Sequence, residues 1–431
     1  MIRLLMFTMI VSFLQSSSIH IVIIGGGLSG ITAGIALAEA GKDVALVSAG
    51  QSTLHFMGGS LDLLGSDERG NDLFKPLDAI AKLNEKHPYK KLEDVSRLAG
   101  VAKQILERAG LATTGYATAN HWRITPIGAL MPTWLTLEGM AAIDDPDKMP
   151  WRKVALVNIV NYLDFPTKFL AAGMRERGVE VDVKAVTLPE FQQLRQSPTE
   201  MRSTNIAKVI EQNDLLVKFA DQVNSVVGEG YDMVLLPSVL GISSNEKAMQ
   251  LLRLINVQAS YVDTLPPSVP GVRMQTMLRK RFMALSGSFF TGDQVIEGIY
   301  DGNNLKGVKT AKLDGTVLEA DNFVLATGSF VSRGLVADYN HVYEPALGVD
   351  VDDLGLDRKT WATVDVTEAQ PYMEMGVATD HKLHCKRSGN VMSNLYAAGS
   401  VLSGHNSIKL LDSAGVDMLT ALQVTENILN Q

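Results

Sequence analysis

Three glycines near the start of the chain, Gly25, Gly27 and Gly30, have the G-x-G-x-x-G spacing of a phosphate-binding turn, and Gly26 adds a fourth glycine to the run. Gly25 permits a tight turn, Gly27 lets a pyrophosphate or phosphate approach the backbone, and Gly30 allows a helix to pack closely on a strand. The helix that follows directs its unsatisfied N–H groups and the positive end of its dipole at the anion. The chemistry that this pattern predicts is nucleotide binding.

The glycines can bind a phosphate only if the flanking segments position them. An apolar, β-branched run at 19–24 predicts a strand before the glycines, and an alanine-rich stretch at 31–40 predicts a helix after them. Residues 43–48 predict a second strand. In dinucleotide folds an acidic residue at the end of that second strand bonds the ribose of the adenosine half.

No carboxylate stands at that place in this chain. The second strand ends in Ser48, and Gln51 and Ser52 follow it. Two interpretations stay open. Either one of these neutral side chains replaces the acid, or the adenosine half is missing and the ligand is a mononucleotide.

Length and composition limit the remaining possibilities. With 431 residues the chain is longer than one hydrophobic core supports, so a main domain with an inserted or cap domain is expected. A net charge of −8 argues against a nucleic-acid-binding surface. The single cysteine, Cys385, excludes a disulfide framework, a Cys-based zinc site and an iron–sulfur ligand set, and it fits a reducing cytoplasm.

Residues 1–18 are expected to form an atypical N-terminal extension. Their apolar run at 4–14 is far shorter than the ~20 residues that span a bilayer, although Arg3 before it and serines after it imitate a signal peptide. The predicted nucleotide strand begins immediately afterwards. We therefore favour a mis-assigned start codon, or a short disordered or membrane-touching extension, over a working signal sequence.

Hydrophobic periodicity predicts an alternation of strands and helices in the middle of the chain. Helices are expected at 78–87, 91–109 and 166–177, and strands at 154–160, 179–186 and 233–237. This order indicates an α/β layer inserted between two parts of the nucleotide-binding domain.

The nucleotide-binding domain is expected to resume near residue 286. Segments 287–290 and 293–300 are expected to pair as strands, and a further strand at 305–313 leads into an Asp-Gly hairpin turn at 314–316. A buried strand at 322–328 ends in Ala-Thr-Gly. We expect it to return beside the first nucleotide strand, where small residues let the backbone pass close to a flavin cofactor.

The cofactor contacts expected there are Thr327 and Gly328, and Gly399 and Ser400 form a second strand-to-glycine junction before a helix at 414–427. We therefore predict an α/β protein with a discontinuous, Rossmann-type dinucleotide-binding flavoprotein domain and an inserted α/β cap region. The flavin-binding domain is placed at 19–70 and 286–431, and the cap region at 71–285.

The chain resembles the B subunits of anaerobic glycerol-3-phosphate dehydrogenases, within the wider fumarate-reductase-like flavoprotein group. The resemblance covers nearly everything from residue 19 to the end and depends on long, position-specific strings. These strings are 50–56, 59–64, 125–128, 133–135, 264–268, 328–330, 334–337, 344–345, 370–371 and 398–402.

The resemblance implies a flavoprotein subunit of a bacterial respiratory complex that oxidises sn-glycerol 3-phosphate to dihydroxyacetone phosphate and sends electrons towards menaquinone. It implies two partners: a catalytic FAD-bearing subunit, which performs most of the substrate oxidation, and an iron–sulfur, membrane-anchoring subunit. This chain would then be cytoplasmic and peripheral at the inner face of the inner membrane. The resemblance associates the B subunits with FMN, which agrees with the absent acid after the second strand, and FAD is the alternative.

The resemblance also directs attention to the loop 51–59, which in the flavoprotein group passes along the edge of the flavin ring. Ser52, Gly58 and Gly59 are then candidates for hydrogen bonds to the flavin. His55 is the only residue of the loop with a pKa near neutrality and is a candidate to manage the proton of flavin reduction; the alternative is a hydrogen-bonded structural histidine.

Two arginines, Arg202 and Arg273, lie in family-like strings of the region expected to cover the flavin. A guanidinium there can grip a phosphate with two hydrogen bonds, whereas a salt bridge within the protein is the alternative.

The chain departs from the resemblance at 409–415, where family members commonly have a glycine-rich run and this chain reads Lys-Leu-Leu-Asp-Ser-Ala-Gly. Asp412 in this segment is placed to cap the last helix. The alternative function that follows is a flavin-poor scaffold that joins the catalytic FAD-bearing subunit to the membrane subunit.

Overall fold

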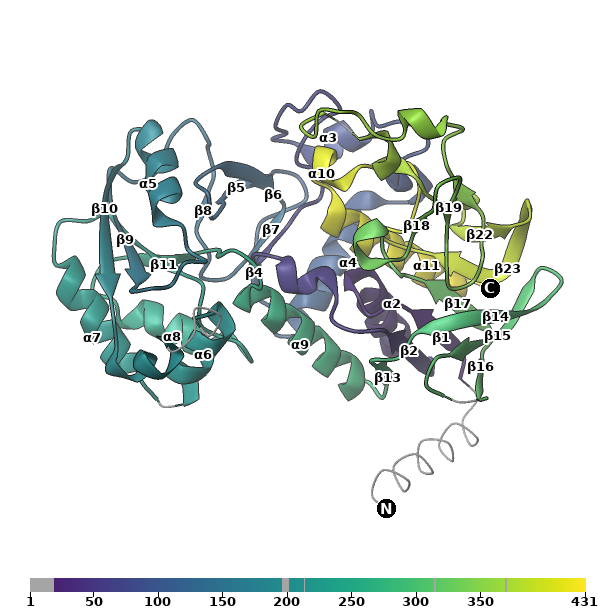
Figure 1. Cartoon of the computed structure of the whole chain (residues 1–431), viewed down its shortest axis with the longest axis horizontal. Helices are drawn as coiled ribbons and strands as arrows, with labels where there is room; N and C mark the ends of the chain where they lie inside the picture. The colour runs from purple at the N-terminus through teal and green to yellow at the C-terminus, as the bar shows by residue number, and fades with distance from the viewer. Residues whose placement is uncertain (1–18, 196–200, 213, 314, 369) are drawn as a thin grey trace, which may run out of the picture. The chain divides into compact units, whose positions relative to one another are not determined.

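The computed structural model describes residues 19–431 except 196–200, 213, 314 and 369 (Figure 1). The expected N-terminal extension at 1–18 and Asp314 of the predicted hairpin turn lie outside the described residues. The chain divides into two compact units. The first comprises 19–52, Lys82–Ile105 and Leu278–Gln431, and the second comprises Thr53–Ala81 and Leu106–Met277.

The first unit is built on a six-stranded sheet in the order β13-β2-β1-β17-β23-β22. All neighbouring strands are parallel except β22 and β23. The strands are β1 (Ile21–Ile24), β2 (Val44–Ser48), β13 (Ser288–Thr291), β17 (Asn322–Leu325), β22 (His384–Arg387) and β23 (Asn390–Ala397). The helices are α2 (Leu28–Glu39), most of α4 (Val95–Arg108), α10 (Ser407–Leu410) and α11 (Ser413–Leu429).

Shorter strands complete the first unit. A three-stranded antiparallel sheet consists of β14 (Val295–Asp301), β15 (Asn304–Thr310) and β16 (Val317–Glu319). Two two-stranded ribbons pair β18 (Val336–Ala337) with β19 (Val342–Tyr343), and β20 (Val351–Asp352) with β21 (Gly376–Val377).

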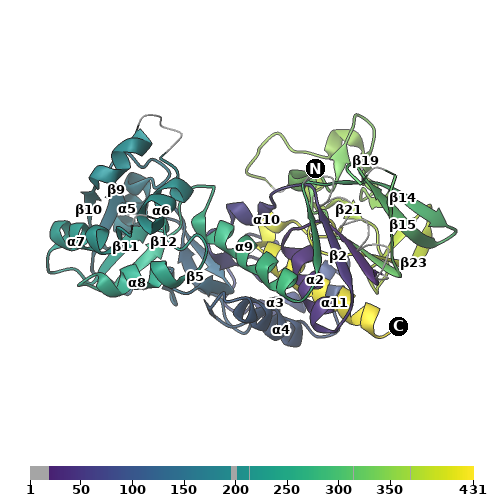
Figure 2. The same ribbon diagram turned by 90° about the horizontal axis from the view of Figure 1, so that it is seen from below.

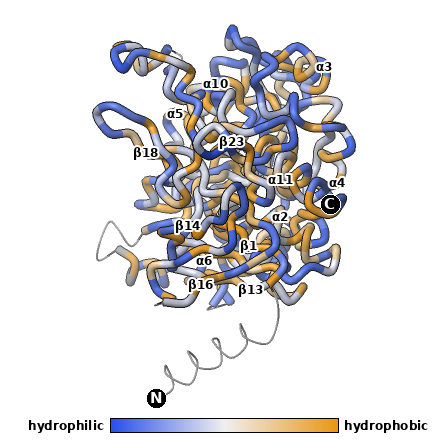
Figure 3. The backbone as a smooth tube through the Cα atoms, turned by 90° about the vertical axis from the view of Figure 1, so that its right-hand side faces the viewer, coloured by the Kyte–Doolittle hydropathy of each residue, from blue (hydrophilic) through white to orange (hydrophobic). Residues whose placement is uncertain are grey.

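Strand β1 lies at the centre of the main sheet because all four of its residues are apolar and buried. It pairs with β2 on one side and β17 on the other, so that Ile24 stands between Val47 and Leu325. Figure 3 shows β1 as a hydrophobic stretch of the chain. Helices α2 and α11 lie side by side in two perpendicular views (Figure 1 and Figure 2). The parallel pairing of β1 with β17 confirms the predicted return of the Ala-Thr-Gly strand beside the first strand.

The expected pairing of 287–290 with 293–300 is wrong. Strand β13 joins the main sheet beside β2, whereas β14 pairs with β15. The chain turns away at Gly292, whose φ of +72° favours glycine. Asp293 then fixes the turn, because its carboxylate accepts a hydrogen bond from the Thr310 hydroxyl at 2.6 Å.

The second unit contains a four-stranded sheet in the order β10-β9-β11-β12 with all strands parallel, which confirms the predicted inserted α/β layer. Its strands are β9 (Lys153–Ile159), β10 (Glu180–Val186), β11 (Met233–Pro237) and β12 (Ala259–Val262). Its helices are α5 (Thr167–Glu176), α6 (Ser203–Gln212), α7 (Leu216–Val227), α8 (Glu246–Leu254) and the greater part of α9 (Val269–Ala284).

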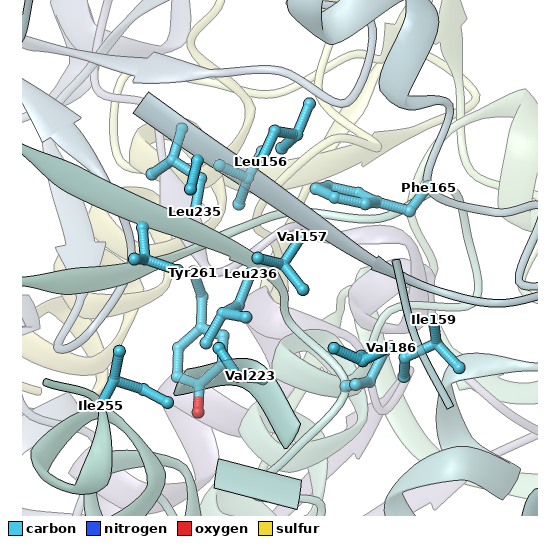
Figure 4. Packing of buried hydrophobic residues seen from close by; sticks show 14 of the residues in the cluster. Leu156, Val157, Ile159, Phe165, Val186, Val223, Leu235, Leu236, Ile255 and Tyr261 are labelled. Atoms are coloured by element: carbon cyan, nitrogen blue, oxygen red, sulfur yellow. The ribbon is translucent and has the colours of Figure 1, made fainter. Parts of the chain in front are cut away.

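The core of the second unit forms around this sheet. Leu156 and Val157 of β9 and Leu235 and Leu236 of β11 are buried together with Val223 of α7 (Figure 4). Because both faces of a parallel sheet are covered, its strands are nearly continuous apolar runs.

Short elements complete the second unit. They are η1 (Thr53–Phe56), β3 (Ser60–Leu61), α3 (Pro76–Ile80), β4 (Thr113–Thr114), β5 (His121–Ile124), β6 (Leu130–Thr133), β7 (Leu135–Leu137) and β8 (Ala142–Ile143).

The two units differ from the expected domain boundaries in three segments, one of which is 278–285, expected in the cap region but part of the first unit. Residues 53–70 belong to the second unit, where β3 pairs with β7. Lys82–Ile105 belongs to the first unit, where the backbone N–H of Glu93 donates to the side chain of Gln423 on α11. A hydrogen bond between distant segments leaves no periodic pattern of apolar residues, so the sequence does not reveal it.

The helix expected at 78–87 is shorter than predicted, because α3 ends at Ile80. Residue His87 has an extended backbone with ψ of 137° and precedes Pro88. Proline disfavours helical geometry in the residue before it, so the apolar spacing across this stretch cannot be realised as one helix.

Candidate functional site

The glycines of the motif mostly serve the fold. Gly25 has a φ of +117°, and a Cβ there would collide with the carbonyl of Ala326 after β17. A Cβ at Gly30 would collide with the carbonyl of Gly25, so α2 packs on the strand end only because residue 30 has no side chain. Gly26 faces the hydroxyl of Ser48 closely, and a Cβ there would collide with it.

Gly27 differs from its neighbours and marks the candidate binding position. It is the N-cap of α2 with an ordinary φ of −75°, and no atom lies within 4 Å of the place where its Cβ would be. The first turn of α2 contains no acidic residue, so its free N–H groups and dipole favour an anion. Among the described residues, the buried hydroxyls of Ser29 and Thr327 have no hydrogen-bond partner. The open position and these two hydroxyls fit a phosphate or pyrophosphate.

The second strand-to-glycine junction lies against the first turn of α2. Gly399 has a φ of +83°, and a Cβ there would collide with the side chains of Ser29 and Asp417. Ser400 donates from its backbone N–H and from its hydroxyl to Asp417 Oδ1, at 2.9 and 2.8 Å. The backbone N–H of Gly399 donates to the Thr420 hydroxyl at 2.8 Å. The start of α2, this junction and α11 therefore form one site in the first unit. We call it the cradle: Gly27, Ser29, Thr327, Gly399 and Ser400.

The backbone of the loop at 328–334 is also closely packed on itself. Gly328 has a φ of +79°, and a Cβ at Gly334 would collide with the Gly328 carbonyl. The Ser332 hydroxyl donates to the Thr327 carbonyl at 2.9 Å. These contacts hold the backbone beside Thr327 in place.

The end of β2 contains no carboxylate, as the sequence indicates. Ser48 is buried, and its hydroxyl donates to the Gly50 carbonyl at 3.1 Å. Gln51 is exposed and Ser52 is half-buried. The Ser48 hydroxyl can still accept a hydrogen bond while it donates this one, so Ser48, Gln51 and Ser52 all stay predicted as neutral replacements for the acid.

Asp412 does not cap α11 with its side chain, contrary to the expectation for 409–415. Its carboxylate is fully buried between two buried histidines. Oδ2 lies 2.9 Å from His87 Nε2, and Oδ1 lies 3.3 Å from His405 Nδ1. We call these three residues the His-Asp-His cluster.

The cluster balances its own charge. Burial raises the pKa of the Asp412 carboxyl, but the two histidines outweigh this effect and hold the pKa well below its ordinary value. Burial lowers the pKa of His405, but Asp412, with Asp417 and Glu374, carries it above its ordinary value. For His87 burial prevails over Asp412, and the pKa is lowered. At pH 6.5, the ordinary pKa of a histidine, these directions favour the protonated form of His405, the ionised form of Asp412 and the neutral form of His87.

Of the loop residues expected to contact the flavin, His55, Gly58 and Gly59 lie in the second unit, whereas Ser52 lies in the first. His55 is half-buried in η1, and burial lowers its pKa although Gln275 opposes this effect with a hydrogen bond. Its carbonyl accepts a hydrogen bond from the backbone N–H of Ser268 at 3.0 Å. A Cβ at Gly58 would collide with the carboxylate of Asp263, whose pKa burial raises to about 6. Gly59 has a φ of +83°, and its carbonyl accepts from the backbone N–H of Leu137.

Both predicted arginines have protein partners in the second unit. Arg202 Nη1 donates to the two carboxylate oxygens of Asp164, at 2.9 and 2.8 Å. Arg273 is buried, and its Nη1 donates to the carbonyls of Leu240 and Gly241, at 3.1 and 2.7 Å. Burial lowers the pKa of Arg273 to about 10. These contacts favour the alternative of partners within the protein, and a phosphate role stays a prediction without structural support.

Sequence reasoning missed four residues of the first unit. Ser29 lies inside the glycine motif, so its place in the first turn of α2 could have singled it out. His87, His405 and Asp417 give no such signal, because His87 is separated from the other two by more than 300 positions and only the fold brings them together.

Comparisons with known proteins concern the family of the whole chain. A family model described as an FAD binding domain matches residues 20–416. A protein of Yersinia enterocolitica, named as the B subunit of anaerobic glycerol-3-phosphate dehydrogenase, is 38% identical over 416 residues, which cover 95% of this chain and 98% of that protein. The chain belongs to this B-subunit family. The B subunit from Pectobacterium carotovorum subsp. carotovorum is 36% identical over the same share of each chain.

The B-subunit family places the chain among flavoprotein oxidoreductases, as the resemblance implied. The open conformation of a flavocytochrome c3 fumarate reductase is similar at 9% identity and a TM-score of 0.44, covering 96% of this chain and 78% of that one. The match to an FAD-binding model supports a flavin, and FAD more directly than FMN. In the described part of the chain, no helix has the length and hydropathy needed to cross a membrane.

Proposed function

We propose that this chain is the flavin-bearing B subunit of an anaerobic glycerol-3-phosphate dehydrogenase. The complex would oxidise sn-glycerol 3-phosphate to dihydroxyacetone phosphate and pass electrons through an iron–sulfur subunit to menaquinone. The observation that carries the proposal is the 38% identity across 95% of the chain with a protein of that name. The cradle adds a physical reason, because it has the open position and the unpartnered hydroxyls that a phosphate-bearing cofactor requires.

Oxidation of the C2 alcohol of glycerol 3-phosphate to a ketone releases two electrons and two protons. A bound flavin supplies a two-electron acceptor. The residues of this chain hold the cofactor: the N–H groups at the start of α2 bind its phosphate, and Ser29 and Thr327 offer hydroxyls beside them. Thr327 and Gly399 follow the ends of β17 and β23, the parallel strand edge where ligands bind in such folds.

The flavin proposed for this site is FAD. The resemblance to the B subunits, with which the absent carboxylate after β2 agrees, predicts FMN, but the matching family model is an FAD binding domain and gives FMN no support. We propose that Gln51 or Ser52 contacts the ribose in place of the acid. Both residues follow β2 directly and are not fully buried.

The electrons must leave this chain through another protein. One cysteine cannot supply the four thiolates of an iron–sulfur cluster, and Cys385 is buried besides. We therefore propose two partners, the catalytic FAD-bearing subunit of the complex together with its iron–sulfur, membrane-anchoring subunit. Through them the chain would be peripheral at the inner face of the bacterial inner membrane.

The decisive experiment measures flavin content and dye reduction by the purified chain. We expect about one flavin per chain and little glycerol-3-phosphate-dependent dye reduction until the catalytic FAD-bearing subunit is added. Rapid oxidation by this chain alone would contradict the proposed division of labour. A folded chain that binds no flavin would instead support the flavin-poor scaffold.

A further inference from the structure

The His-Asp-His cluster is a costly way to hold its segments together. Buried ion pairs are often no more stabilising than apolar side chains of similar volume, because both charges lose their water. His87, His405 and Asp412 are each at most 4% exposed. Since the attraction between the His405 and Asp412 charges does little more than offset their lost hydration, we looked for a role of the cluster besides stability.

The cluster is connected to the cradle by short steps within the first unit. His405 faces Asp412 and Asp417 on α11 and Glu374 on a separate segment, whereas His87 faces Asp412, His405 and Lys90. Asp417 in turn accepts both hydrogen bonds of Ser400. Ser400 is adjacent to Gly399, which packs against the side chain of Ser29 at the start of α2.

We propose that His405 is a positioning residue of the flavin site: held by Asp412 and supported by His87, its proton cancels the buried negative charge of Asp412, so that no net negative charge of this pair opposes the reduction of a flavin bound in the cradle. This inference rests on the proposed flavin binding and adds the residues that set the charge around the cofactor. Sequence patterns do not indicate it, because His87 lies more than 300 positions before His405 and Asp412.

The charges of the cluster determine whether loss of the His405 proton makes flavin reduction easier or harder. While His405 is protonated, its charge and that of Asp412 cancel. When His405 loses its proton, one uncompensated negative charge stays buried near the cradle, and the flavin becomes harder to reduce. Linkage is reciprocal, so negative charge on the flavin must in turn raise the proton affinity of His405.

The first test is an NMR titration of the histidines in the full-length chain, in flavin-free, oxidised flavin-bound and dithionite-reduced flavin-bound forms. His384 is the matched control, because its Nδ1 lies 3.1 Å from Asp380 in another His–Asp pair of the same unit. We expect the pKa of His405 to rise by about 0.5 or more between the flavin-free and reduced forms, and the spectrum of the His384 control to be unaffected by flavin reduction. An unshifted His405 in a flavin-loaded chain would overturn the inference.

The second test is the midpoint potential of the bound flavin as a function of pH. In the unmodified chain the potential should fall more steeply with pH once His405 begins to lose its proton. Asp412→Asn should remove this added slope, and Asp380→Asn should keep it. An added slope that survives in a folded Asp412→Asn chain would contradict the inference.

The outcomes separate the inference from the function on which it rests. A chain that binds no flavin overturns both, whereas a chain that binds flavin without shifting His405 overturns only the role of the cluster. If Asp412→Asn does not fold, the titration of the unmodified chain still decides the question.

Discussion

Replacing Gly27 with valine tests the cradle with little disturbance of the fold. Gly27 has a φ of −75° that any residue adopts, and the space around its missing Cβ is empty. Valine is a poor N-cap, so we expect a loss of about 1 kcal/mol of stability at most. Its methyl groups would occupy the place from which a phosphate reaches the N–H groups of α2.

The loss of flavin affinity should be much larger than the loss of stability. One hydrogen bond to a charged group contributes about 1.5–3 kcal/mol, and the end of a helix dipole adds about 0.3–1 kcal/mol. Displacing the phosphate from two N–H groups therefore costs at least about 3 kcal/mol. At about 1.4 kcal/mol for each factor of ten, flavin should bind about 100-fold more weakly or worse.

The assay is flavin absorbance of the purified variant, followed by titration with added flavin. Gly100→Val is the matched control, because Gly100 is also exposed to empty space on a helix of the first unit. The control should keep its flavin. A folded Gly27→Val chain with normal flavin content would refute the assignment of the cradle.

Four further predictions follow from the same structure. Flavin released by heating should co-elute with FAD in chromatography, and FMN in stoichiometric amount would contradict the family-based proposal. Asp412→Asn should cost about 3–5 kcal/mol of unfolding free energy in denaturant titrations, because it breaks a buried pair. The unmodified cluster should stabilise the folded state most near pH 6.5. The raised pKa of His405 makes its contribution complete below pH 6.5, and this contribution is lost as the pH rises through the raised pKa. The lowered pKa of His87 makes its contribution complete above pH 6.5, and this contribution is lost as the pH falls below 6.5. Arg273→Met should destabilise the second unit yet leave flavin affinity unchanged, and a selective loss of flavin would show that its contacts with two carbonyls are not its main role.

The nucleotide motif and the strands around it could be predicted because their causes are local. Gly25 and Gly30 are required by close backbone approach, and β1 is a run of apolar residues that only a sheet centre buries completely. The inserted parallel sheet was predictable for the same reason, since β9 and β11 are also continuous apolar runs.

What the sequence did not reveal depends on contacts between distant segments. The pairing of β14 with β15 was missed because a single turn at Gly292 decides which sheet each strand joins. The partner of Asp412 was missed because His87 lies 325 positions away, and no periodicity connects the two. For Arg273 the sequence leaves a phosphate or a partner within the protein open, and only the fold shows its contacts with carbonyls 32 and 33 positions earlier.

One measurement tests the central claim, that electrons from glycerol 3-phosphate pass through a flavin held by this chain. The complex is assembled from its purified subunits with either the unmodified chain or Gly27→Val, and menaquinone reduction is followed after addition of sn-glycerol 3-phosphate. The account predicts one flavin fewer per complex with Gly27→Val, and loss of quinone reduction while dye reduction by the catalytic FAD-bearing subunit persists. Unchanged quinone reduction by the flavin-depleted complex would contradict it.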